Sequence, residues 1–366
     1  MKFYNSEAGA ELAVLENVPL LKPGELSSLM ADAVKQLLRE GESAHTVASY
    51  RTALRYWAGW FALRYGSALT LPLPASAAQQ FIVDHIQRQT GSGLHHELPD
   101  PIDQALVTAG LKGKIGPMAL GTLVHRLAVL SKLHQDHKLF NPCADPQVRH
   151  LLAMTRRAHA KRGALPQRKD ALVATGLRSA LDTCGVDLKG LRDRALLLFA
   201  WSTGGRRRSE VAGADMRWLK PIGPLEYSYQ MGVSKTNQDA TARNENFKPV
   251  VGTAAAALEA WLKAAVITEG PLFRRIGKGG RIGAALSPAA VRDIVKARCG
   301  AAGLVGDFSA HSLRSGFVTE AVRQDVPLAE TMAMTGHRSV QSLIGYARGS
   351  GGKHTALRLL GESTSD

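Results

Sequence analysis

Apolar residues recur at helical spacing along most of the chain. Between residues 43 and 66 they are spaced four, three and four residues apart, which places them on one face of a helix: Tyr50, Leu54, Trp57 and Phe61. Ser43 or Thr46 could cap the start of this helix. The same periodicity predicts further helices at 25–39, 75–89, 119–138, 146–160, 170–184, 189–203, 252–266, 287–299, 311–323 and 327–334. Residues 90–103, TGSGLHHELPDPID, are broken by Gly and Pro and predict a loop.

Alternating patterns are confined to the second half of the chain. Residues 225–235 and 244–252 alternate apolar with polar positions and contain β-forming residues, so they predict a small antiparallel sheet. The fold class is therefore mainly α, with an all-α N-terminal part and a C-terminal part that holds the sheet.

The length and composition favour two domains. A chain of 366 residues exceeds one ordinary core, and its 45% hydrophobic content is enough for two. Residues 146–169 contain seven basic residues and no acidic one, and their last part holds Gly and Pro. We expect an N-terminal extension at 1–24, a helical domain at 25–160, a basic linker at 161–169 and a second domain at 170–366.

The net charge changes the picture from a generic helical protein to a nucleic-acid binder. A formal charge of +15 favours a polyanionic partner, most simply DNA or RNA. The basic segment would then cross a phosphate backbone; the alternative is a solvated linker with incidental charge. The expected DNA-binding residues are Arg149, Arg156, Arg157, Lys161 and Arg162.

Cysteine and histidine usage indicates neither disulfides nor a metal. Cys143, Cys184 and Cys299 lie far apart without C-x-x-C spacing, which fits a reducing cytosol. His95, His96 and Glu97 fall in the expected loop, where adjacent histidines are more often solvent-exposed than ligands. The N-terminus has no long apolar region of a signal peptide, and residues 195–201 are too short an apolar run for a membrane helix. We expect a cytoplasmic, nucleoid-associated protein with no cofactor and no membrane partner.

Four clusters in the second half carry candidate chemistry. Residues 202–216, STGGRRRSEVAGADM, place a Gly-Gly turn and three arginines before Ser209-Glu210. Lys235 follows the first predicted strand, and His311 and Arg314 lie one helical turn apart. His337 precedes Tyr346 by nine residues. Each cluster alone is a weak signal, whereas their order and spacing together are specific.

Together these clusters resemble the tyrosine recombinase, or phage integrase, family. The pattern is R-x-S-E, a strand lysine, H-x-x-R, G-H and a tyrosine, over residues ~165 to 350. The resemblance implies a two-domain C-shaped clamp on DNA, with a helical core-binding domain before the catalytic domain. It implies these catalytic residues: Arg207, Lys235, His311, Arg314, His337 and Tyr346. Glu210 would orient the arginine or histidine. Arg206 or Arg208 remains an alternative to Arg207, and Lys248 an alternative to Lys235.

The residue chemistry fits strand cleavage by a tyrosine. Arginine forks neutralise the charge that builds on phosphate oxygens during attack. His311 would assist loss of the phenolic proton of Tyr346, Lys235 would protonate the leaving 5′-oxygen, and His337 would hydrogen-bond the phosphate. A covalent phosphotyrosyl bond conserves the energy of the broken linkage, so rejoining would need neither metal nor ATP.

The expected function is site-specific DNA recombination on double-stranded DNA with short inverted core sites. A type IB topoisomerase-like nicking-closing enzyme and a non-catalytic DNA-binding regulator remain alternatives. The resemblance implies a homotetramer on two DNA sites, with a monomer or weak dimer in solution. It also implies that the tail after Tyr346, with a short apolar patch at 356–360, docks into an adjacent protomer; folding back onto its own domain remains the alternative.

Overall fold

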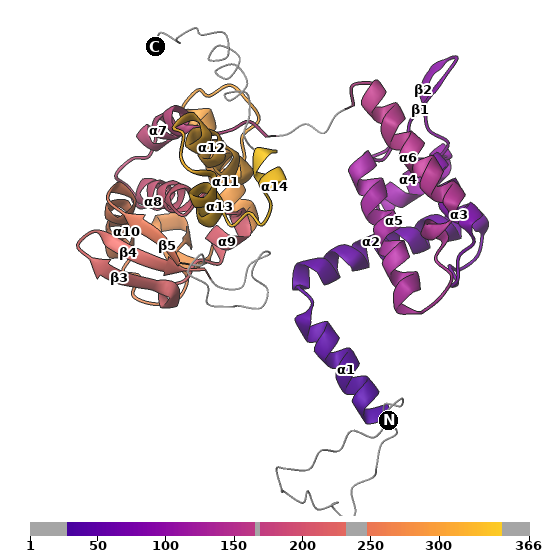
Figure 1. Cartoon of the computed structure of the whole chain (residues 1–366), viewed down its shortest axis with the longest axis horizontal. Coiled ribbons are helices and arrows are strands. Elements are labelled where there is room, and N and C mark those ends of the chain that lie inside the picture. Colours follow the sequence, from indigo (N-terminus) through magenta and orange to yellow (C-terminus); the bar gives the residue numbers. More distant parts are fainter. Residues whose placement is uncertain (1–27, 165–168, 232–246, 346–366) are drawn as a thin grey trace, which may run out of the picture. The chain divides into compact units, whose positions relative to one another are not determined.

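The computed structural model describes residues 28–164, 169–231 and 247–345. The chain divides into two compact units, Met1–Pro166 and Gln167–Asp366, so the boundary falls inside the basic segment at 161–169 (Figure 1). The expected N-terminal extension and the C-terminal tail lie outside the described residues. Within the described ranges no helix has the length and apolar character needed to cross a membrane.

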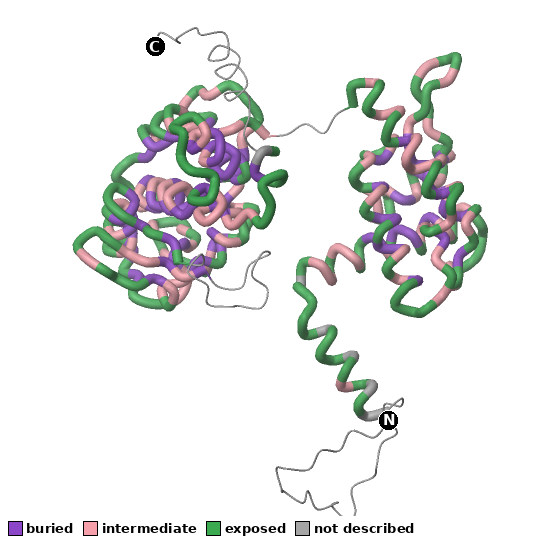
Figure 2. Tube along the Cα trace, viewed as in Figure 1, coloured by how far each residue is buried: buried purple, intermediate pink, exposed green. Residues whose placement is uncertain are grey.

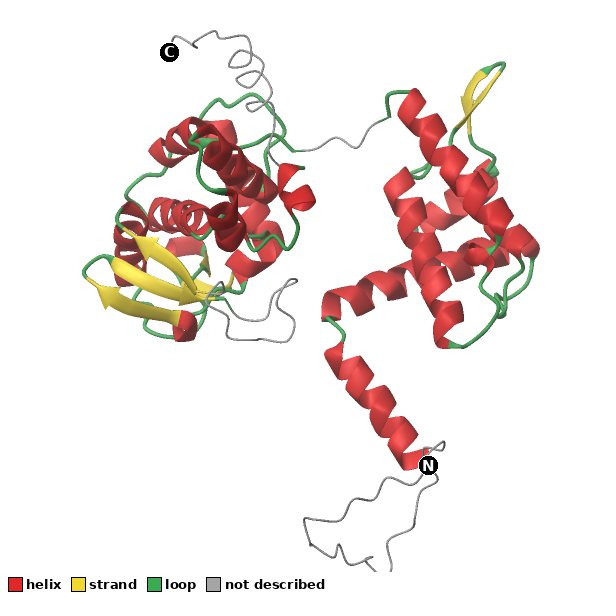
Figure 3. Ribbon diagram, viewed as in Figure 1, coloured by secondary structure: helices red, strands yellow, loops and turns green. Residues whose placement is uncertain are grey.

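The first unit is helical, as its periodicity predicts (Figure 3). Its helices are α1 (Ser28–Gly41), α2 (Ala44–Tyr65), α3 (Ala75–His85), α4 (Asp100–Thr108), α5 (Leu120–Asp136) and α6 (Pro146–Lys161), with a short 3-10 turn η1 (Pro142–Ala144). Of the two candidate caps of α2, Ser43 is the N-cap, and its side chain accepts a hydrogen bond from the Thr46 backbone.

The loop expected at 90–103 is wrong. Strands β1 (Arg88–Thr90) and β2 (Gly93–His95) pair antiparallel, and α4 begins at Asp100. Gly91 and Ser92 form the tight turn of this hairpin. Pro101 lies in the first turn of α4, where its missing N–H costs nothing. Helix α3 correspondingly ends at His85, earlier than the expected residue 89.

The buried face of α2 differs from the expected one. Ala53, Tyr56, Trp57 and Trp60 are buried, whereas Tyr50, Leu54 and Phe61 are only half-buried. Figure 2 shows that the buried positions of this unit lie where its helices come together. Tyr56 and Trp60 can be buried because their polar ends are satisfied: the Tyr56 hydroxyl lies 2.6 Å from His85 Nε2, and Trp60 Nε1 donates to Asp84. Periodicity alone does not contain these partners.

The described part of the second unit combines helices with a three-stranded antiparallel sheet and a separate two-stranded hairpin. Its helices are α7 (Ala174–Asp182), α8 (Leu188–Ser202), α9 (Arg208–Ala212), α10 (Thr253–Ala264), α11 (Pro288–Ala301), α12 (Ala310–Arg323), α13 (Leu328–Thr335) and α14 (Val340–Ile344). The sheet has the order β3 (Leu219–Gly223), β4 (Glu226–Gln230) and β5 (Phe247–Val251). The paired strands β4 and β5 confirm the predicted sheet, while β3 was not foreseen.

A second hairpin and two 3-10 turns complete the unit. Strands β6 (Arg274–Ile276) and β7 (Ile282–Ala285) pair antiparallel around η4 (Lys278–Gly280), and η2 (Met216–Trp218) precedes β3. Helices α8 and α10 pack together and both contact β5, burying Phe199, Leu258 and Trp261. This core supports the turn between α8 and α9, where the candidate site begins.

Candidate functional site at the junction of α9, α12 and α13

A two-glycine turn brings three helices together. Gly204 and Gly205 follow α8 with φ values of +91° and +67°, a region that residues with a Cβ rarely adopt. A Cβ on Gly204 would lie 2.2 Å from the Met334 carbonyl oxygen, and one on Gly205 would lie 2.3 Å from the Arg314 Cα. The turn therefore needs glycine twice, because it packs against the end of α13 and the start of α12.

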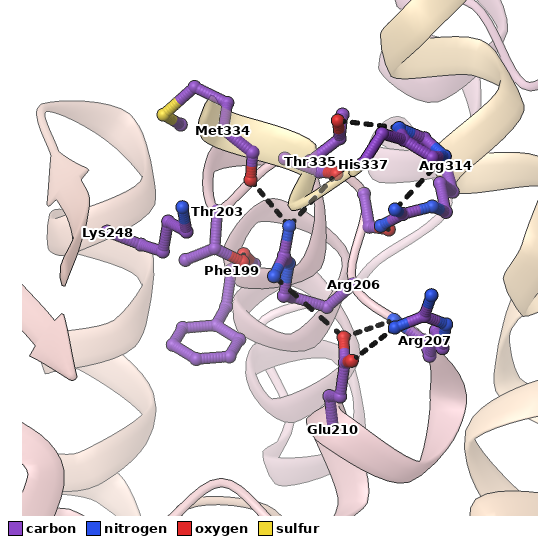
Figure 4. Close-up of polar contacts among 12 residues, drawn as sticks. Phe199, Thr203, Arg206, Arg207, Glu210, Lys248, Arg314, Met334, Thr335 and His337 are labelled. Atoms are coloured by element: carbon purple, nitrogen blue, oxygen red, sulfur yellow. Dashed lines mark hydrogen bonds and ion pairs between the residues drawn. The ribbon is translucent and has the colours of Figure 1, made fainter. Parts of the chain in front are cut away.

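The next two residues point in different directions. The Arg206 side chain is only 5% exposed, and its Nη2 donates to the Met334 carbonyl oxygen at 2.5 Å. The Arg207 side chain is 29% exposed, and its Nη1 donates to Glu210 Oε1 at 2.9 Å (Figure 4). Arg208 is exposed as the first residue of α9. Arg207 is thus the more exposed of the two arginines, whereas the Arg206 guanidinium is engaged by the end of α13.

Glu210 connects the two arginines. Its Oε2 accepts from the Arg207 backbone N–H at 3.0 Å and lies 3.9 Å from Arg206 Nη1. Burial alone would raise the pKa of Glu210, but the charges of Arg206 and Arg207, with the hydrogen bonds from Arg207, outweigh burial and lower that pKa. The lowered pKa favours the ionised carboxylate, which accepts from both the backbone and the guanidinium of Arg207; its role as an orienting residue stays a prediction.

Arg314 and His337 form a second pair. Arg314 lies on α12, is 1% exposed, and donates from Nη2 to His337 Nε2 at 3.2 Å. Because arginine only donates, Nε2 must accept, so the His337 proton sits on Nδ1 and points to Thr335 Oγ1 at 2.7 Å. Thr335 in turn donates to the Thr331 carbonyl oxygen. This chain of hydrogen bonds specifies one imidazole tautomer.

The surroundings of His337 keep it neutral. Burial, followed by the positive charges of Arg314, Arg207, Arg206 and His311, lowers the pKa of His337 to about 4. His311 is exposed on the first turn of α12. The structure therefore gathers four of the expected site residues, Arg207, His311, Arg314 and His337, from three separate segments into one cluster, in which a neutral His337 lies beside Arg314.

Lys248, the alternative lysine, is not part of an open site. It lies on β5 with 2% exposure, and its Nζ donates to the Ala333 carbonyl oxygen. Lys235 and Tyr346 lie outside the described residues. Thr335 and the carbonyls of Ala333 and Met334 belong to the site but carry no sequence signal, because their roles arise only from packing.

Comparisons with known proteins place this site in a family. The model of the phage integrase family matches residues 172–351, which contain every residue of the cluster. These residues belong to the phage integrase family. The "Integrase/recombinase xerD homolog" of Selenomonas ruminantium is 31% identical over 216 residues, which is 56% of this chain and 61% of that protein. The chain thus spans about 61% of the length of this curated relative.

Solved structures share the fold. The Tn1549 transposon integrase in complex with transposon right end DNA is 13% identical, with a TM-score of 0.54 over 90% of this chain and 98% of that one. A lambda integrase dimer bound to a COC′ core site is 13% identical, with a TM-score of 0.52 over 89% of this chain and 96% of that one. At this identity the likeness concerns the fold.

Outside the phage integrase region, the expected DNA-binding residues lie on or just after α6. Four of them are exposed: Arg149, Arg156, Arg157 and Lys161. Helix α6 ends at Lys161, so it includes the first residue of the expected linker. Arg162 differs: it is half-buried, and its Nη2 donates to the Gln87 carbonyl oxygen at 3.0 Å. In the described part of the chain no three His, Cys, Asp or Glu residues gather as a metal site.

Proposed function

We propose that the protein is a site-specific DNA recombinase that cleaves and rejoins strands through a 3′-phosphotyrosyl intermediate. The observation that carries the proposal is the cluster of Arg207, His311, Arg314 and His337, in which the buried Glu210 carboxylate holds Arg207 and Arg314 is hydrogen-bonded to His337. Such a cluster suits a phosphodiester whose oxygens gain charge as the phosphorus is attacked. The membership of residues 172–351 in the phage integrase family supports the same reaction.

Each residue has a defined task in the proposed reaction. Arg207 and Arg314 would hold the non-bridging oxygens, and Glu210 would keep Arg207 oriented. Tyr346 would attack phosphorus while His311 takes its proton, and Lys235 would protonate the departing 5′-oxygen. His337 would hydrogen-bond the phosphate. Rejoining reverses these steps, so we propose that neither metal nor ATP is consumed.

The proposed partner is double-stranded DNA with short inverted core sites, bound by a homotetramer across two such sites. The curated relative is named an integrase/recombinase, and both solved neighbours were bound to DNA, which supports a DNA substrate. A protein that recombines chromosomal DNA works where that DNA lies, so we propose the cytoplasm, at the nucleoid.

A suicide substrate, nicked so that the cleaved end diffuses away, tests the chemistry. We expect wild-type protein to form a covalent adduct in excess EDTA and Tyr346→Phe to form none while binding DNA normally. An adduct with the Phe variant would remove Tyr346 as the nucleophile. If the wild-type protein forms no adduct on any DNA tested, including repeats that flank its own gene, a non-catalytic regulator is favoured. Supercoil relaxation without strand exchange between two sites would favour the topoisomerase-like alternative.

A further inference from the structure

Two buried cations meet the C-terminal end of α13. Arg206 comes from the turn before α9 and Lys248 from β5, and they are 4% and 2% exposed. Arg206 Nη2 donates to the Met334 carbonyl oxygen, and Lys248 Nζ donates to the Ala333 carbonyl oxygen. Figure 4 shows both side chains pointing toward this end of the helix.

The end of a helix is a suitable partner for these charges. The last four carbonyl groups of a helix lack intrahelical partners and carry partial negative charge. In α13 the Gly336 N–H donates to the Met332 carbonyl oxygen. Lys248 and Arg206 donate to the next two carbonyl oxygens, those of Ala333 and Met334. A buried cation is tolerated where charge and hydrogen bonds compensate it, and Glu210 adds compensation for Arg206 at 3.9 Å.

The held segment leads directly into the site. Met334 is followed by Thr335, which accepts the His337 Nδ1 hydrogen bond, and by His337 itself, paired with Arg314. Gly204 approaches the same Met334 carbonyl so closely that a Cβ could not be placed there. Helix α14 then begins at Val340, and the expected nucleophile Tyr346 lies two residues after its end.

We propose that Arg206 and Lys248 are positioning residues that clamp the end of α13 and so set His337, and the segment leading to Tyr346, against Arg207 and Arg314. The clamp also ties the two halves of the cluster together, since Arg206 faces Glu210 and Glu210 holds Arg207. The catalytic consequence rests on the proposed strand-cleavage function; the positioning of His337 does not.

The Lys248→Met variant of the full-length protein separates an effect on the position of His337 from an electrostatic effect on its pKa. The charges that depress the pKa of His337 most strongly are those of Arg314, Arg207, Arg206 and His311, not that of Lys248. We expect loss of Lys248 to alter the His337 imidazole resonances in NMR spectra of the free protein, because the Arg314 and Thr335 hydrogen bonds shift. Lys248→Arg should restore them, and Lys220→Met, on an exposed position of the same sheet, should leave them unchanged.

Cleavage of a suicide substrate provides the second measurement. Lys248→Met and Arg206→Met should bind DNA within about threefold of wild type, while the single-turnover cleavage rate falls roughly 10²-fold, as expected for an ångström-scale misplacement. Lys248→Arg and Arg206→Lys should recover much of the rate. Lys220→Met should cleave as wild type does.

A folded Lys248→Met protein with wild-type His337 resonances and a wild-type cleavage rate would overturn the clamp. If that variant does not fold, Lys248→Gln replaces it, and failure of this neutral donor to fold would assign Lys248 to the core instead. Absence of cleavage in wild type would count against the proposed function alone, because the His337 resonances still decide whether Lys248 positions that residue.

Discussion

Arg314 donates a hydrogen bond to His337 Nε2 at 3.2 Å, so in the DNA-free protein this imidazole acts as an acceptor. Its proton is directed inward to Thr335. A phosphate oxygen cannot donate to Nε2, so His337 can bind a phosphate only if it gains a proton there or if its ring changes tautomer. Contact with the proposed DNA phosphate through Nε2 therefore requires a change in either the protonation or the tautomer of His337.

The titration of His337 should reveal a change in its protonation. In the free protein we expect its pKa near 4, because burial and neighbouring cations disfavour the charged form. A bound phosphodiester supplies negative charge that favours imidazolium, so the pKa should rise when a core-site duplex binds to Tyr346→Phe. NMR titration of the imidazole measures both values. A pKa near 6.5 in the free protein would contradict the buried, cation-flanked environment.

Arg207 should be the arginine that cleavage needs. Arg207→Ala should lower the single-turnover cleavage rate roughly 10²- to 10³-fold, since it removes a donor aimed at developing charge. Glu210→Gln should lower it less, because the guanidinium remains but loses its buried carboxylate. Arg208→Ala is the matched control and should cleave nearly normally. The reverse pattern for Arg207 and Arg208 would move the register by one residue.

The identity of the general acid can be separated from the role of Lys248. A substrate with sulfur in place of the bridging 5′-oxygen has a leaving group that needs no proton. Lys235→Ala should cleave it far faster than the oxygen substrate. Lys248→Ala should gain no such advantage, because Lys248 is buried against the Ala333 carbonyl. If only Lys248→Ala is rescued, the acid role belongs to Lys248.

The exposed cations of α6 should supply affinity without sequence choice. Gln substitutions at Arg149, Arg156, Arg157 and Lys161 should weaken binding to target and random duplexes alike. The slope of log K against log salt should shrink by about 0.9 for each phosphate contact removed. Arg162→Gln should change the slope less, since its guanidinium is engaged by the Gln87 carbonyl. An unchanged slope in the fourfold variant would mean that α6 does not touch the backbone.

Much of the fold follows from local sequence, and the candidate site residues follow from the family that the sequence resembles. Helical periodicity predicted every helix of eight or more residues in the described ranges except α4, with small errors at the ends, because apolar residues recur at helical spacing along these segments. The order of R-x-S-E, H-x-x-R and G-H, through the family that it resembles, predicted Arg207, His311, Arg314 and His337 as site residues, with Arg206 or Arg208 as alternatives to Arg207. Helix α4 was not predicted because the Pro and Gly residues near its start are typical of loops.

Only the tertiary structure decided what each of these residues does. Whether Arg206 or Arg207 faces outward depends on the backbone of a two-glycine turn and on a carbonyl 128 residues away in the sequence. Lys248 shows the same dependence: on β5 it occupies an ordinary strand position, yet packing buries it against the end of α13. A charged side chain is buried at low cost only where hydrogen-bond partners compensate it, and for Arg206 and Lys248 those partners belong to a distant segment of the chain. The sequence by itself determined which groups are present and on which elements they lie; long-range packing determined their directions, their hydrogen-bond partners and their protonation.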